Sequence, residues 1–193
     1  MPIDKSIDYS AITPEIKALT KLCLADNVIE PEMYVKYAVN RGLRDLNGNG
    51  VLTGLTEISE IQSSKMVDGE KVPCEGKLFY RGVDVEQIVS GFIREKRYGF
   101  EETVYLLLFG ALPDEAQLDD FKKLLAGYRS LPTNFVRDVI LKAPNADMMN
   151  TLARSVLTLY SYDARATDNS TENVLRQCLQ LIALFPMLSV YGY

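Results

Sequence analysis

The sequence predicts a mainly α-helical fold with a small β-hairpin excursion near residues 55–82. Two patterns indicate this class. Apolar residues recur at three- and four-residue spacing before residue 42 and again from Val83 onward, as in helices that bury one face. Between these regions, six glycines separate short runs of strand-like sequence. There is no repeat or low-complexity linker, so we expect one domain over residues 1–193.

Two helices are expected near the amino terminus. Thr13 is a suitable N-cap before Pro14, which is favoured at the first helical position, and the apolar stripe continues to about Ala25. A second, short helix is expected to begin at Pro31. We expect it to end at Gly42, because glycine readily adopts the left-handed conformation that closes a helix.

The glycine-rich region predicts one or two small β-hairpins at the edge of the helical body. Residues 57–62 and 77–80 are short strand-like runs, and Asp68-Gly69 is a favoured two-residue turn. Arg81 follows the second run. We expect it to be structural, held by backbone carbonyls or an acid, with Gly82 supplying the turn.

Everything after Val83 is expected to be helical. The apolar stripes predict helices over residues 83–92, 100–111, 113–125, 131–140, 148–160 and 170–182. The second of these is apolar nearly all round, which is typical of a buried helix, and Leu112-Pro113 is expected to end it. Pro186 is expected to interrupt the last helix.

The composition restricts the chemistry. The chain contains no histidine, so it can form no Ser-His-Asp or Cys-His nucleophile pair and has no imidazole metal ligand or acid–base group. Its formal net charge is −5, which argues against a nucleic-acid-binding surface. Cys23, Cys74 and Cys178 are odd in number and far apart, as in reduced cytosolic proteins. Neither a signal peptide nor a membrane span is expected.

Residues 45–50 resemble the first half of an EF-hand calcium loop. A calcium loop of this type needs a bidentate carboxylate at its twelfth position. That position is Thr56 here, and Glu57 falls one residue late. We therefore expect a tight loop, which Asn and Gly favour, and no metal site.

Three carboxylate pairs could in principle act as an acid–base dyad, but their surroundings indicate solvated surface. They are Glu57/Glu60, Glu101/Glu102 and Asp119/Asp120. Arg41 and Arg44 bracket a helix end beside the glycine-rich loop. A helix carboxyl end favours cations, which is sufficient to explain both, although Arg44 could also meet a phosphate.

Several ordered blocks together resemble the amino-terminal part of citrate synthase, of the bacterial, cytosolic type. The blocks are GLRD at 42–45, GLT at 54–56, GKLFYRGVDV at 76–85, FEE at 100–102, LLLFGALP at 106–113 and LIA at 181–183. The resemblance runs from about Thr13 to Tyr193. It implies part of the family's multi-helical large domain, with the small domain and the catalytic half absent.

The resemblance also implies the chemistry of the parent enzyme, an acyltransferase of the tricarboxylic acid cycle. In the family, acetyl-CoA condenses with oxaloacetate and citryl-CoA is hydrolysed, using an Asp and two His beyond the matched region. No catalytic, metal or cofactor residue is therefore expected in this chain; acetyl-CoA is a substrate. Asp147 stands where the family often has a His. Arg44 matches an Arg that reaches the CoA phosphates of the neighbouring subunit.

The resemblance further implies a cytoplasmic homodimer that binds small molecules, and neither nucleic acid nor membrane. Residues 181–193 carry no charge, and we expect the chain to be a truncated fragment that is inactive alone. Two alternatives remain open. One is a 2-methylcitrate synthase-type condensing enzyme, and the other is a non-catalytic helical module that assembles with itself or with a separate partner.

Overall fold

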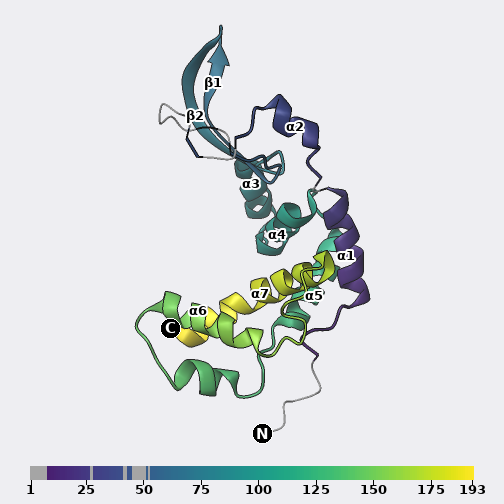
Figure 1. Cartoon of the computed structure of the whole chain (residues 1–193), viewed down its shortest axis with the longest axis vertical. Coiled ribbons are helices and arrows are strands. Elements are labelled where there is room, and N and C mark those ends of the chain that lie inside the picture. Colours follow the sequence, from purple (N-terminus) through teal and green to yellow (C-terminus); the bar gives the residue numbers. More distant parts are fainter. Residues whose placement is uncertain (1–7, 27, 41–42, 45–50, 52) are drawn as a thin grey trace. The chain divides into compact units, whose positions relative to one another are not determined.

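The computed structural model describes residues 8–26, 28–40, 43–44, 51 and 53–193. Its helices and one small antiparallel sheet confirm the predicted mainly α class (Figure 1). The chain divides into two compact units, the first formed by residues 1–21 and 119–193 and the second by residues 22–118. The two helices at the boundaries of this division are α1 (Pro14–Ala25) and α5 (Glu115–Tyr128).

The described residues of the second unit form the sheet and three helices that lie wholly within it. The elements are α2 (Pro31–Lys36), β1 (Ser59–Val67), β2 (Glu70–Tyr80), β3 (Val83–Asp84), α3 (Val85–Glu95) and α4 (Phe100–Phe109). Its core is formed by Ile88 and by Tyr105, Leu106 and Phe109 of α4. The rings of Tyr105 and Phe109 meet edge to face with their centroids 4.7 Å apart. The expectation that α4 is a buried helix therefore holds in part, since Leu107 and Leu108 are only half-buried.

The two predicted strand-like runs are the ends of a single long hairpin. Asp68-Gly69 forms the predicted turn, and both residues have positive φ, as a two-residue hairpin turn requires. Ile61 pairs with Leu78 toward the end of the hairpin that is opposite the turn. The register of the two strands shifts between Gln62 and Ser64. The hairpin extends away from α3 in Figure 1. The sequence pattern missed the length because most of both strands is exposed, so their central residues show no alternation of buried and exposed side chains.

Arg81 has the structural role predicted for it. Its Nε and Nη2 both donate hydrogen bonds to the carbonyl oxygen of Leu107 in α4, at 3.1 and 3.0 Å. Gly82 has φ +79°, so it supplies the turn from β2 into β3. A single side chain therefore connects the base of the hairpin to the buried helix.

Two helix ends differ from the prediction. Helix α2 ends at Lys36, and Ala38 adopts φ +49°, so the predicted end at Gly42 is wrong; Gly42 itself lies outside the described residues. Helix α4 ends at Phe109 rather than at Leu112-Pro113. Gly110 closes it in the left-handed conformation, and its N–H donates to the carbonyl of Leu106.

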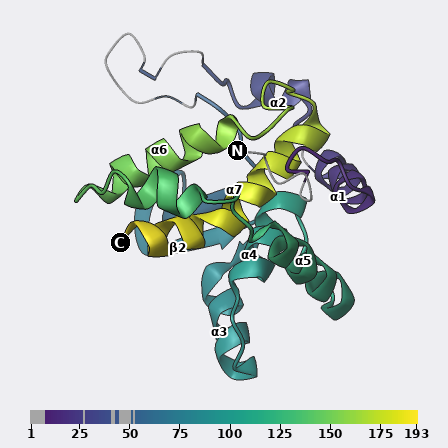
Figure 2. The ribbon, with the colours of Figure 1, turned by 90° about the horizontal axis from the view of Figure 1, so that it is seen from below.

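The first unit is built around helix α7. Helix α7 spans Thr171–Gly192. Two helices pack against it, α6 (Met148–Tyr160) and the short η1 (Val136–Leu141). Figure 2 shows α6 and α7 side by side. Phe135, Ile140 and Leu188 form a buried cluster. Helix η1 is a π-helix, in which residues five apart approach each other. That spacing brings Phe135 and Ile140 to the same cluster, which α-helical periodicity would not predict.

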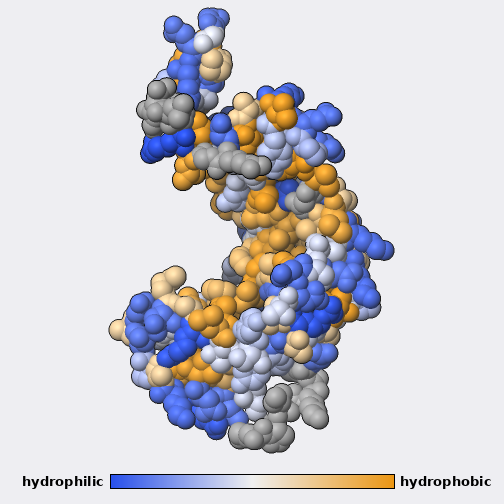
Figure 3. Space-filling view, in the orientation of Figure 1, coloured by the Kyte–Doolittle hydropathy of each residue, from blue (hydrophilic) through white to orange (hydrophobic). Residues whose placement is uncertain are grey.

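Helix α7 continues through Pro186, contrary to the predicted interruption. Pro186 lies on an exposed side, while Leu184 and Leu188 are buried on either side of it. Their packing outweighs the missing backbone donor. Among the described residues, α7 is the one helix long and apolar enough to cross a membrane, although its Arg176 is fully buried in the first unit. Apolar surface remains visible along α7 in Figure 3.

The Arg81 contact generates a stability prediction. Replacing Arg81 with Met keeps an apolar stem but leaves the Leu107 carbonyl without its charged donors. We expect a loss of about 1.5–3 kcal/mol in the free energy of unfolding, measured by urea denaturation. The matched control is Arg94→Met, which replaces an exposed arginine of α3 and should lose at most a few tenths of a kcal/mol. Equal losses in both variants would contradict the role assigned to Arg81.

Candidate functional site

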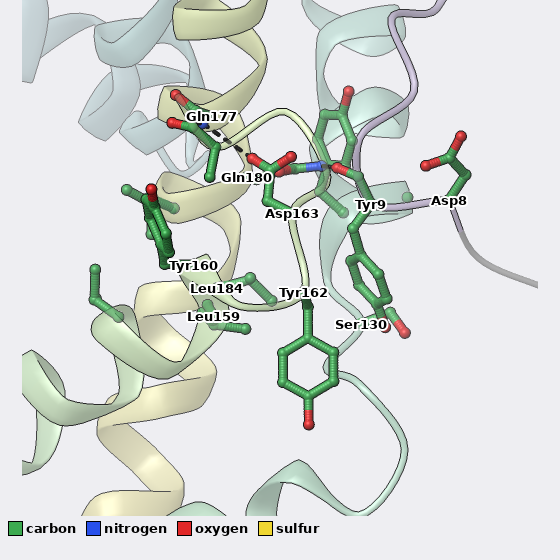
Figure 4. Close-up of a pocket in the computed structure, with 15 residues that line it drawn as sticks. Asp8, Tyr9, Ser130, Leu159, Tyr160, Tyr162, Asp163, Gln177, Gln180 and Leu184 are labelled. Carbon is green, nitrogen blue, oxygen red and sulfur yellow. Dashed lines mark hydrogen bonds between the residues drawn. The ribbon is translucent and has the colours of Figure 1, made fainter. Parts of the chain in front are cut away.

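The first unit contains a cavity of about 350 Å³ with a polar wall, and a second concave region of about 400 Å³ lies beside the end of α7. The walls of the first cavity come from the segment before α1, from the end of α5, from α6 with the loop after it, and from one face of α7 (Figure 4). The lining residues are mostly apolar and aromatic, with four tyrosines: Tyr9, Tyr128, Tyr160 and Tyr162. A cavity of this size and lining is in the range of sites that take an organic group.

One polar wall of the cavity is organised by Arg176, which is fully buried. Its Nη2 donates to Asp163 Oδ2 at 2.6 Å and to Asn173 Oδ1 at 2.7 Å. Its Nη1 donates to Gln180 Oε1 at 2.8 Å and to the carbonyl of Tyr9, and its Nε donates to Asn173. All three nitrogens are thus engaged within the protein, so Arg176 holds the wall together and is not available to bind a ligand.

Asp163 is the acceptor that neutralises this buried cation. Burial alone would raise the pKa of Asp163, but hydrogen bonds to its carboxylate outweigh that effect and lower the pKa to about 2. The donors are Arg176, Gln177, the backbone N–H of Arg165 and the Ser10 hydroxyl. Figure 4 shows the Gln177 amide directed toward Asp163. The carboxylate is therefore ionised at neutral pH and cannot act as a general acid there.

Two groups of this unit are buried without a hydrogen-bond partner among the described residues. They are the Tyr128 hydroxyl, which belongs to a cavity-lining residue, and the Nε and Nη2 of Arg154 on α6. Burial raises the pKa of Tyr128, so its hydroxyl stays a neutral donor. A buried donor without an acceptor costs about 1–3 kcal/mol, and such groups are rare in complete folds.

The residue singled out from sequence, Arg44, lies in the other unit. It is exposed and forms an isolated β-bridge. The stretch that follows it, residues 45–50 with the calcium-like motif, lies outside the described residues. Within the described part of the chain, no three His, Cys, Asp or Glu side chains are grouped to hold a metal.

The carboxylate pairs are not brought together as dyads. Glu57 and Glu60 are exposed, as are Asp119 and Asp120, and Asp120 pairs with Lys123 at 3.0 Å. Glu102 pairs with Arg97. The interpretation of these carboxylates as surface groups agrees with the structure for the first and third pairs, whereas Glu101 and Glu102 are half-buried.

Sequence reasoning missed the cavity and its polar wall. One signal was available, because Arg176 is the only charged residue between Asn173 and Tyr193. A lone charge within an apolar helix indicates a buried, paired group. Its partners could not be inferred, since Tyr9 and Asp163 lie 167 and 13 residues away and outside any helix.

The Asp163 carboxylate generates a pH prediction. Its pKa is lower in the folded chain than its ordinary value of 3.8, so its stabilisation is present above about pH 4 and is lost as the pH falls toward 2. We expect Asp163→Asn to lower the free energy of unfolding by about 2 kcal/mol near pH 6. The difference in unfolding free energy between variant and wild type should become smaller between pH 4 and 2. Urea denaturation across this range measures it.

The control for this experiment is Asp120→Asn, which removes an exposed carboxylate from the same chain. Its difference from wild type should stay within about 0.5 kcal/mol at every pH. A constant gap for Asp163→Asn across pH 2–6 would show that the carboxylate charge is not the source of the stabilisation.

Comparison with known proteins identifies the family. Residues 45–193 match the family model described as citrate synthase, C-terminal domain. A citrate synthase of Saccharolobus solfataricus is 33% identical over 107 residues, which are 55% of this chain and 26% of that protein. The 2-methylcitrate synthase 1 of Corynebacterium glutamicum is 30% identical over 141 residues, or 72% of this chain and 32% of that protein.

The fold agrees with the sequence comparison. The crystal structure of citrate synthase from Pyrobaculum aerophilum superposes with a TM-score of 0.58 and 27% identity, covering 78% of this chain and 37% of that one. The chain thus spans roughly a quarter to two fifths of the relatives that it matches. Because the family model matches well over half of the sequence and the folds agree, this chain belongs to the citrate synthase family.

Proposed function

We propose that this chain is the amino-terminal part of the large domain of a condensing enzyme of the citrate or 2-methylcitrate synthase type. The family match over residues 45–193 supports the enzyme type, and the placement in the amino-terminal part of the large domain rests on the order of the sequence blocks. The enzyme joins the acyl group of a CoA thioester to oxaloacetate, with the helices described above as part of its scaffold. Relatives of both names match, so the acyl group is acetyl or the one-carbon-longer propionyl.

The second part of the proposal is that the 193-residue chain has no activity by itself. The family resemblance assigns the polarisation of both substrates to imidazoles, and this sequence has none. The buried cation of the first unit cannot replace them, because every nitrogen of Arg176 is already used. The chain therefore contributes structure and needs further residues for chemistry.

This proposal predicts the outcome of a simple assay. The purified chain, mixed with oxaloacetate and either acetyl-CoA or propionyl-CoA, should release free CoA thiol no faster than a no-protein control. A full-length citrate synthase in the same assay shows that the reagents work. Thiol release by the chain that depends on oxaloacetate would overturn the proposed inactivity.

A non-catalytic assembly module is a second candidate, favoured by the exposed apolar side chains of α6 and α7. Leu157 is 74% exposed and Val190 is 75% exposed. Large side chains of this kind in contiguous patches mark interaction surfaces. A complementation experiment distinguishes the two candidates. If the chain is part of a condensing enzyme, adding the rest of the fold produces condensing activity. If it is an assembly module, it associates with its partner and no activity appears.

We also propose that Arg44 contacts a CoA phosphate of the neighbouring subunit in the assembled enzyme. Its exposure and its place before residues 45–50 support this role. Arg44→Ala in the assembled enzyme should raise the KM for acyl-CoA about tenfold with kcat unchanged, since a charged hydrogen bond contributes about 1.5 kcal/mol or more. Steady-state kinetics measure both constants.

Two comparisons make this kinetic test specific. An acyl-CoA that lacks the 3′-phosphate should show a smaller difference between wild type and Arg44→Ala if that phosphate is the partner. Arg94→Ala, which removes another exposed arginine of the same unit, should leave the KM unchanged. An unchanged KM in Arg44→Ala with the complete substrate would refute the assignment.

A further inference from the structure

We draw no further inference here: the strongest candidate, the exposed β1–β2 hairpin that carries Ile61, Met66 and Val72 on its surface, supports no proposal because nothing in the described part of the structure shows what covers it.

Discussion

The first unit depends on the pairing of one buried cation. Arg176 stands on the core helix α7, and a charge in that position is tolerable only if its hydrogen-bonding groups find acceptors. Asp163 neutralises it, while Tyr9 and Gln180 complete its bonds. The segment before α1 and the loop after α6 are thereby fixed to one helix, and the cavity is lined by all three. The polar wall therefore determines both the shape of the cavity and the negative charge of its lining.

Local sequence signals predicted most elements and failed where tertiary contacts decide. The boundaries of α1 and α6 and the turn of the hairpin agree with the structure, because caps and turn dipeptides act within a few residues. The interruption predicted at Pro186 is absent, because packing of Leu184 and Leu188 keeps α7 continuous. The helix predicted over residues 131–140 is a π-helix over Val136–Leu141, and α-helical periodicity does not report that spacing.

The candidate site was less predictable than the fold for the same reason. The structural role of Arg81 could be predicted from sequence, because the residue lies between the end of a strand-like run and Gly82. The polar wall around Arg176 joins residues from opposite ends of the chain, and a periodic sequence pattern cannot predict contacts between such distant segments. Arg44 was a possible phosphate contact from its place beside a glycine-rich loop, and only the family resemblance gave it a specific partner. The family itself was accessible because its blocks are local runs of sequence, which the comparisons confirm over residues 45–193.

The bond between Tyr9 and Arg176 also has a consequence for biosynthesis. Its partners are 167 residues apart, so the ribosome produces Tyr9 long before its partner exists. At roughly 5–20 residues per second, the segment before α1 waits on the order of ten seconds or more for its docking site. Such a distant closure adds to the contact order and delays folding of this unit until α7 has left the ribosome.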